Sequence, residues 1–317
     1  MRPALSVVTT LYRSAAHLEE FYRRMTAVAS RVAPDHELIF VDDGSPDDSL
    51  HVALALCASD PRVSVVELSR NFGHHRAMMT GLARARGDLV FLIDSDLEEQ
   101  PEWLELFANR LHASDVDVVY GVQEKRKGSS FERATGYVFY RLFNALSDVQ
   151  MPRNVSTVRL MRRRYVRNLV AHRDRELFIA GLWALTGFRQ EPISIAKVSA
   201  SPSTYTIGKR ITNLLDAVTS LSRRPLVLVF YLGLTVVLAS ALGVIYLVYE
   251  RIASGFLPGW TSLIVSVWML GGLTLFSIGL VGLYLSRIFI ETKRRPYTVI
   301  RQVYRQATLA RGDAPRA

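Results

Sequence analysis

Cysteine is almost absent from this chain of 317 residues, because Cys57 is the only one. A single thiol excludes a disulfide scaffold and indicates either a reducing compartment or no redox role. Glycine and proline are also sparse, with 19 and 12 residues, which excludes a collagen-like fibre. Hydrophobic residues make up 49% of the sequence, and this content excludes a disordered chain.

Charge is missing from two long stretches near the C-terminus. Residues 225–249 and 252–286 contain no Asp, Glu, Lys or Arg, whereas about 20 apolar residues are enough to cross a bilayer. The sequence therefore predicts a transmembrane hairpin over 225–290, with crossings at about 225–249 and 263–286. The alternative is a pair of core helices, but these seldom run so long without a polar face. Glycines in the second stretch would let helices approach closely, which is compatible with a homo-oligomer.

Lysine and arginine lie on both sides of the predicted hairpin. They are concentrated in 197–224 and again in 287–316, while the connecting loop holds only Glu250 and Arg251. By the positive-inside rule we expect an integral protein of a bacterial-type inner membrane, with both termini cytoplasmic. Residues 1–12 contain no long apolar run, so we expect no cleaved secretion signal.

The flanks of the hairpin give two further expectations. An apolar stripe with basic ends predicts an amphipathic juxtamembrane helix over 201–224, although an ordinary packed helix has the same pattern. Residues 291–317 are expected to form a basic cytoplasmic tail. The net charge of +10 is thus concentrated near the membrane, and since no nucleic-acid-binding motif accompanies it, we expect no nucleic-acid partner.

Short apolar runs alternate with helical patterns in the first 120 residues. The predicted strands are 5–9, 37–41, 63–68, 89–93 and 116–120. Nearly continuous apolar strands are typical of a parallel sheet covered on both faces. The fold class is therefore α/β, a Rossmann-like open sheet in a cytosolic domain over 1–200, and ligands should bind at the carboxyl ends of its strands.

Acidic residues follow two of these strands. Asp42 and Asp43 come directly after one apolar run, and Asp94 and Asp96 follow another. Either motif alone is more often a simple turn. Together they are more informative, because two carboxylates at i and i+2 can bind one hard divalent ion that bridges a diphosphate, if the turn curls. The first pair is then placed to accept hydrogen bonds from a ribose or a base.

Several short motifs in a fixed order carry a resemblance to a known family. They are Val41-Asp42-Asp43-Gly44-Ser45, Ser69-Arg70-Asn71-Phe72-Gly73-His74, Gly87-Asp88, Asp94-Ser95-Asp96-Leu97, Val119-Tyr120-Gly121 and Arg159-Leu160-Met161, followed by two apolar spans. The chain resembles the family-2 inverting glycosyltransferases, and within them the polyprenyl-phosphate glycosyltransferases of the dolichyl-phosphate mannose synthase type. The resemblance implies a GT-A domain that uses Mg²⁺ or Mn²⁺. It also implies transfer of one sugar from a nucleoside-diphosphate sugar to polyprenyl phosphate among the membrane lipids, at the cytoplasmic face.

The resemblance also implies roles for individual residues on the donor side. The residues that would contact the donor nucleotide are Thr10, Tyr12, Asp42 and Asp43. Asp94 and Asp96 would bind the metal and take part in catalysis. The family's usual Leu-Gln-Asp-Pro after the metal motif is replaced here by 97–100, Leu-Glu-Glu-Gln, which bears on the donor sugar.

On the acceptor side the resemblance implies catalytic roles for Arg126 and Arg159 and acceptor contacts for Ser203 and Tyr205. An aspartate that is common in the family is Thr157 in this chain. A hydroxyl acceptor would need such a base, but a phosphate monoester, with a second pKa of about 6, is already largely ionised near pH 7. What a phosphate acceptor needs is cationic neutralisation, which the arginines could supply.

Two other functions remain open from the sequence. A processive polysaccharide synthase shares the donor domain, but the expected Gln-x-x-Arg-Trp element and further spans do not occur. A membrane-anchored, non-catalytic nucleotide-sugar binding or scaffold protein would need no metal motif, and the presence of Asp94 and Asp96 argues against it.

Overall fold

The computed structural model describes residues 2–123, 154–172, 174, 179–196, 224–254 and 259–309. These residues fall into two compact units. The first contains the described residues up to 196 together with those from 295 onward, and the second contains the described part of 224–294. Each unit is described by itself.

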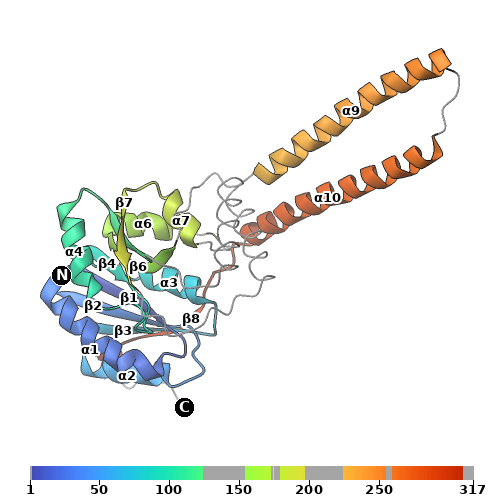
Figure 1. The fold of residues 1–317 in the computed structure, drawn as a ribbon. Helices are drawn as coiled ribbons and strands as arrows, with labels where there is room; N and C mark the ends of the chain where they lie inside the picture. The colour runs from blue at the N-terminus through green and yellow to red at the C-terminus, as the bar shows by residue number, and fades with distance from the viewer. Residues whose placement is uncertain are drawn as a thin grey trace. The chain divides into compact units, whose positions relative to one another are not determined.

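An eight-stranded sheet forms the centre of the first unit, with strand order β7-β5-β6-β4-β1-β2-β3-β8 (Figure 1). The strands are β1 (Leu5–Leu11), β2 (His36–Asp42), β3 (Val63–Leu68), β4 (Leu89–Leu92), β5 (Val118–Gln123), β6 (Val155–Arg162), β7 (Gln190–Ile195) and β8 (Ile300–Arg305). All five strands predicted in the first 120 residues are present, with ends shifted by at most three residues.

The sheet is mixed, which corrects the expectation of a parallel one. Strands β1, β2, β3 and β4 are mutually parallel neighbours, and β5 pairs in parallel with β7. However, β6 lies antiparallel between β4 and β5, and β8 lies antiparallel beside β3. Both antiparallel strands come from segments rich in arginine, which hides the apolar pattern of a buried strand.

Helices cover both faces of this sheet, as expected for an open α/β fold. The helices of the first unit are α1 (Ala15–Val32), α2 (Ser49–Ser59), α3 (His74–Leu82), α4 (Trp103–Ala113), α6 (Arg163–Ala171), α7 (Ile179–Leu185) and α11 (Gln306–Leu309). Buried side chains of α1, α2 and α4 form one core with one face of the sheet. Those of α3, α6 and α7 form a second core with the other face.

Helix α1 confirms the helical pattern expected between the first two strands. Leu18, Phe21 and Met25 are fully buried on one face of this helix. Ser14 occupies the N-cap position, but its hydroxyl makes no capping bond to the helix. It instead accepts the backbone N–H of Tyr12 and lies 3.0 Å from the hydroxyl of Ser95, another residue of the site described below.

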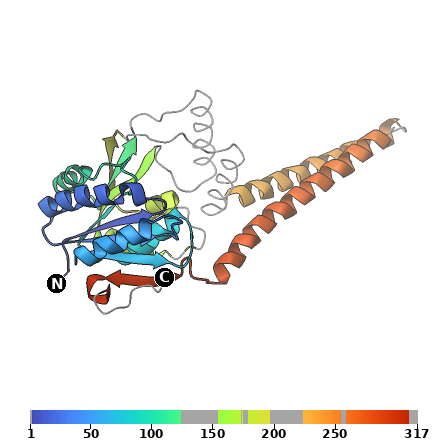
Figure 2. The ribbon, with the colours of Figure 1, turned by 90° about the horizontal axis from the view of Figure 1, so that it is seen from below.

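The C-terminal segment returns to the sheet, which corrects the expectation that 291–317 is a basic tail. Strand β8 is the outermost strand beside β3, as Figure 2 shows. Tyr304 is fully buried, and its hydroxyl donates to Glu67 Oε2 at 2.7 Å. The Arg301 guanidinium donates to Glu67 Oε1 at 2.9 Å. A carboxylate on β3 thus holds two side chains that follow it by more than 230 residues of sequence.

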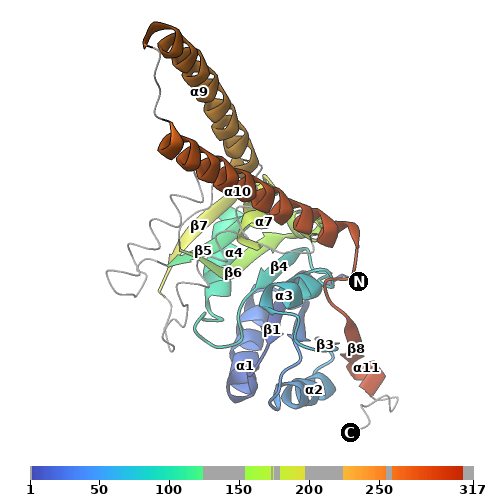
Figure 3. The same ribbon diagram turned by 90° about the vertical axis from the view of Figure 1, so that its right-hand side faces the viewer.

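The described residues of the second unit form two apolar helices, α9 (Arg224–Ser254) and α10 (Trp260–Thr292), seen again in Figure 3. Among the described residues, one helical segment, Ser266–Thr292 of α10, is long and apolar enough by composition to cross a membrane. The apolar segment of α9, Arg224–Ser240, is shorter. The hairpin over 225–290 therefore stays a prediction. The amphipathic helix predicted over 201–224 lies outside the described residues except for Arg224.

Candidate active site

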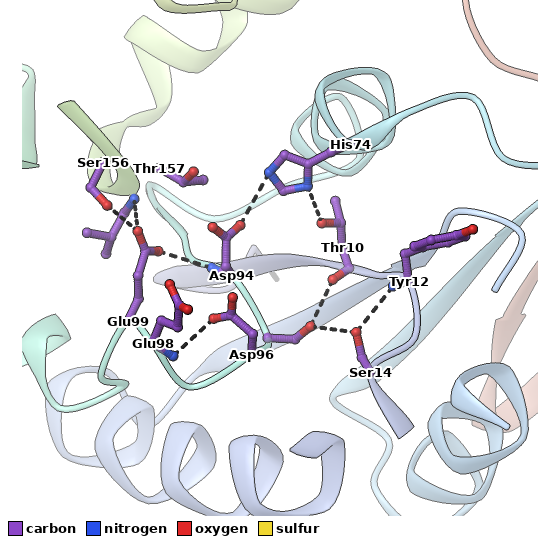
Figure 4. A network of polar contacts seen from close by, with 12 residues as sticks. Thr10, Tyr12, Ser14, His74, Asp94, Asp96, Glu98, Glu99, Ser156 and Thr157 are labelled. Carbon is purple, nitrogen blue, oxygen red and sulfur yellow. Dashed lines mark hydrogen bonds and ion pairs between the residues drawn. The ribbon is translucent and has the colours of Figure 1, made fainter. Parts of the chain in front are cut away.

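Three parallel strands end together at one edge of the sheet. The register pairs Leu11 with Asp42 across β1 and β2, and Val8 with Leu92 across β1 and β4. The residues that follow these strand ends therefore meet at the same edge, where ligands bind in open α/β sheets. Figure 4 shows this region, with Thr10 and Tyr12 from β1 and its end and Asp94 and Asp96 from the turn after β4.

A histidine links the ends of β1 and β4. His74 Nδ1 lies 2.9 Å from Thr10 Oγ1, and His74 Nε2 lies 3.4 Å from Asp94 Oδ1 (Figure 4). His74 is the first residue of α3 and follows Gly73, whose φ of 98° few other residues adopt. His74 was not among the predicted site residues, although its position after the carboxyl end of β3 was a usable signal.

The turn after β4 curls sharply. Leu97 has φ 62°, a left-handed conformation that costs energy for a residue other than glycine. Ser95 is buried, and its hydroxyl donates to the Thr10 carbonyl at 3.0 Å, which fixes the turn to β1. The Asp96 carboxylate accepts a hydrogen bond from the Glu98 backbone at 3.0 Å. The turn is thus held in shape by a bond within it and by a bond to β1.

The donor set of this turn fits the predicted Mg²⁺ or Mn²⁺. Within the residues that the structure describes, no group of three or more His, Cys, Asp and Glu side chains is arranged to hold a metal. Mg²⁺ in phosphate-transfer sites, however, is typically bound by one or two carboxylates, with phosphate oxygens and water completing the octahedron. Asp94 is partly exposed and Asp96 is exposed, so both carboxylates can reach such a ligand. Metal binding by these two residues stays a prediction.

A second acid beside the turn is fully buried. Glu99 is 0% exposed and accepts hydrogen bonds from the Asp94 backbone N–H at 3.2 Å, the Val158 backbone N–H at 3.2 Å and the Ser156 hydroxyl. The sequence placed Glu99 only within the 97–100 segment after the metal motif, and its bonds to β6 emerge only in the tertiary structure.

The acidic pair after β2 divides into two roles. The Asp43 carboxylate accepts the backbone N–H groups of Phe72 at 2.7 Å and Gly73 at 2.9 Å, and it thereby fixes the loop that carries His74. Asp42 is 2% exposed, and its Oδ1 has no hydrogen-bond partner among the described residues. Burial raises the pKa of Asp42 to about 6. A buried oxygen without a partner is costly, and a bound ligand, ion or water is one explanation for it.

Arg159 lies deeper than the sequence suggested. Its side chain is 1% exposed, its guanidinium donates to the carbonyls of Thr157 at 3.1 Å and Ser156 at 3.2 Å, and it lies over the Trp183 ring. Burial lowers the pKa of Arg159 to about 10. In this arrangement the Arg159 guanidinium binds backbone carbonyls of its own strand, β6. The predicted contact of Arg159 with the acceptor stays a prediction.

The other predicted residues are placed as follows. Tyr12 is 47% exposed, so its ring is accessible to a ligand. Arg126, Ser203 and Tyr205 lie outside the described residues.

The segment that contains the site matches the model of a known sequence family. The model of the family described as "Glycosyl transferase family 2" matches residues 6–170, more than half of the chain. The chain belongs to glycosyl transferase family 2. Both carboxylates of the turn and His74 lie within the matched segment, whereas β8 lies beyond it. Family membership and the open mixed sheet together support the GT-A-like fold that the resemblance implied.

Similar proteins cover nearly the whole chain. A protein of Mycobacterium tuberculosis named as a glycosyltransferase is 53% identical over 95% of this chain and 88% of its own length. A bactoprenol glucosyl transferase of Shigella phage SfII is 31% identical over 95% of this chain and 98% of its own length. The chain is therefore a glycosyltransferase.

Among solved structures, glucosyl-3-phosphoglycerate synthase from Mycobacterium tuberculosis, in complex with Mn²⁺, UDP and glucosyl-3-phosphoglycerate, is 21% identical. The similarity covers 69% of this chain and 79% of that chain, with a TM-score of 0.46.

Proposed function

We propose that this glycosyltransferase transfers a single sugar from a nucleoside-diphosphate sugar to polyprenyl phosphate at the cytoplasmic membrane face, with inversion of the anomeric carbon. The observation that carries the proposal concerns the turn after β4, which holds Asp94 and Asp96 and is called the metal-type turn below. This turn lies beside β6, a strand that contains no Asp or Glu. The antiparallel register of β4 and β6 ends with Leu92 opposite Arg159, and its continuation by two residues would bring Asp94 opposite Thr157. Relatives named as bactoprenol glucosyl transferases support the choice of acceptor.

The donor side is assigned to the ends of β1, β2 and β4. Asp42 would hold the base or ribose through its unpaired oxygen. Tyr12, which follows the Leu11 that pairs with Asp42, is exposed. Asp94 and Asp96 would hold Mg²⁺ or Mn²⁺, which when bound stabilises the leaving diphosphate. Through its contacts to Thr10 and Asp94, His74 orients the carboxylate that would face this group.

The acceptor side is defined by Thr157. A threonine cannot take a proton from a hydroxyl acceptor near neutral pH, so an acceptor that arrives already ionised is favoured. A phosphate monoester, with a second pKa of about 6, meets this requirement. The ionised phosphate oxygen can then attack the anomeric carbon in line while the bond to the diphosphate breaks.

Two anions must approach each other in this reaction. At about 4 Å and an effective dielectric of about 20, the repulsion between two unit charges is about 4 kcal/mol. Cations near the acceptor must offset it. Arg126 and Arg159 are our candidates for this role, with Ser203 and Tyr205 on the acceptor side as well.

The membrane part of the proposal rests on α9 and α10. The second contains a segment long and apolar enough to cross a bilayer, and both helices lack charge through their centres. We propose that they form a hairpin with both termini in the cytoplasm, because lysines and arginines flank it on both sides. A lipid acceptor would then be available at the same membrane face as the donor site.

The decisive experiment supplies membranes containing the full chain with labelled nucleotide sugars, Mg²⁺ or Mn²⁺, and either polyprenyl phosphate or the corresponding polyprenol. We expect an acid-labile, organic-extractable glycolipid from the phosphate only. Product from the polyprenol would show that the acceptor is activated by a base and would contradict the argument from Thr157. Nucleotide-sugar binding without any product would favour the non-catalytic scaffold, and a long polymer would favour the processive synthase.

Asp96→Asn is the matched test of the metal assignment. The substitution keeps the size of the side chain and removes one carboxylate from the turn. We expect turnover to fall by about 100-fold or more while the protein still inserts into membranes. Unchanged turnover would refute the assignment.

A further inference from the structure

The buried acid Glu99 has contacts that point beyond a role in stability. Glu99 follows the metal-type turn by three residues and is 0% exposed. Burying a carboxylate is costly unless hydrogen bonds compensate it. The two oxygens of Glu99 receive such bonds from both sides of the site, as Figure 4 shows.

Each oxygen of this carboxylate serves a different strand. Oε2 accepts the backbone N–H of Asp94 at 3.2 Å, in the turn after β4. Oε1 accepts the Ser156 hydroxyl and the Val158 backbone N–H, the latter at 3.2 Å, both on β6. Glu99 therefore joins the turn that carries the predicted metal ligand Asp94 to strand β6.

The contacts on β6 enclose Thr157. Successive side chains of a strand point to opposite faces, so Thr157 points away from the face shared by its two neighbours. Since one oxygen holds both Ser156 and Val158, it fixes the backbone of Thr157 between them. The other oxygen fixes the backbone of Asp94, two residues past Leu92, which is the last β4 residue paired with β6.

We propose that Glu99 is a positioning residue that sets the separation between the Asp94 turn and Thr157, and through it the affinity of the turn for a divalent metal. This inference rests on the proposed function, because it takes Asp94 as a metal ligand. Residues that hydrogen-bond metal ligands without touching the metal change its affinity by about 10- to 100-fold when they are replaced.

The informative substitution is Glu99→Gln. Glutamine keeps the length of the side chain, but one end becomes an NH₂ donor. The remaining amide oxygen can accept from the donors of β6 or from the Asp94 N–H, but not from both. The new NH₂ group then faces the donors that are left, and two donors repel each other. The matched control is Glu102→Gln, which removes the same charge three residues later from a partly exposed pair with Arg24.

The experiment measures Mn²⁺ binding to the full chain in the presence of UDP, using the EPR signal of the free Mn²⁺ to detect how much is bound. The protein is kept in detergent, well below its melting temperature. We expect Glu99→Gln to weaken Mn²⁺ binding by about 10-fold or more and Glu102→Gln to leave it unchanged. If Glu99 only stabilises the fold, Glu99→Gln will lower the melting temperature while the folded protein binds Mn²⁺ as the unmodified chain does. That result overturns the inference.

Two further variants keep the test decisive. Ser156→Ala retains the carboxylate and removes one of its donors, so it serves if Glu99→Gln does not fold. We expect Mn²⁺ binding about 2- to 10-fold weaker, since one hydrogen bond is lost, and unchanged binding refutes the inference. Asp94→Asn separates the two hypotheses, because unchanged Mn²⁺ binding in that variant would refute the proposed metal site itself.

Discussion

Replacement of Asp42 by asparagine should raise stability at neutral pH while weakening donor binding. Asp42 is 2% exposed, with one carboxylate oxygen bonded to the Ser45 backbone N–H at 3.3 Å and the other without a partner among the described residues. Burial, and to a smaller extent the nearby charge of Glu67, favours the protonated form of this carboxyl. Asparagine has the same shape and carries no charge to bury.

The size of the effect follows from the pKa. Burial raises the pKa of Asp42 from its ordinary value of 3.8 to about 6. The protonated form is favoured in the folded protein, so its stabilisation is complete below about pH 4 and is lost as the pH rises through about 6. A difference of about 2 pKa units corresponds to about 3 kcal/mol. The free energy of unfolding should therefore fall by about 3 kcal/mol across this range, and the fall should be absent in Asp42→Asn.

The assay is the melting temperature of the first unit within the full chain in detergent, measured from pH 4.5 to 7.5. At about 2–4 °C per kcal/mol, Asp42→Asn should melt about 6–12 °C higher than the unmodified chain at pH 7.5 and only about 2–4 °C higher at pH 4.5, where about 1 kcal/mol of the effect is present. The control is Asp48→Asn, which removes the charge of an exposed aspartate nearby in the chain.

Parallel pH profiles for Asp42→Asn and the unmodified chain would refute the reasoning. The second readout is binding of the donor nucleotide, which should weaken by about 10-fold or more because a hydrogen bond to a charged acceptor is lost. A variant that is more stable and binds as well would leave Asp42 without a role in donor binding.

Two further predictions concern the sheet. Tyr304→Phe removes the hydroxyl that donates to Glu67 at 2.7 Å, and we expect a loss of about 1–3 kcal/mol, seen as a lower melting temperature, while Tyr12→Phe, at a side chain that is 47% exposed, should change it little. Gly87→Ala places a Cβ 2.5 Å from the Ser6 backbone nitrogen and 2.7 Å from the Leu89 carbonyl oxygen, so it should destabilise the first unit by about 3 kcal/mol. Gly271→Ala is its control, because a Cβ there would meet no atom within 4 Å beyond the adjoining backbone of its own helix. Equal melting of all these variants would contradict both predictions.

Periodicity predicted the central strands and α1 because those residues are buried on known faces. Residues 5–11, 36–42 and 63–68 are buried nearly throughout, and an apolar run forms the middle of each, as expected for strands covered on both faces. Strands β6 and β8 carry arginines that hydrogen-bond to backbone carbonyls or to Glu67, so their charge concealed their place in the sheet. A single sequence does not show which distant partner satisfies a charged side chain.

The sequence by itself determined the fold class, the two acidic turns and the lack of charge in the C-terminal helices, because each depends on residues close together in the chain. Only the tertiary structure decided that His74 contacts Asp94 and Thr10 and that Glu99 joins the turn after β4 to β6. It also decided that β8 is the edge strand beside β3. Those contacts join residues up to 237 positions apart. Such pairs form because strand order brings their backbones together, and no local pattern in the chain specifies that order.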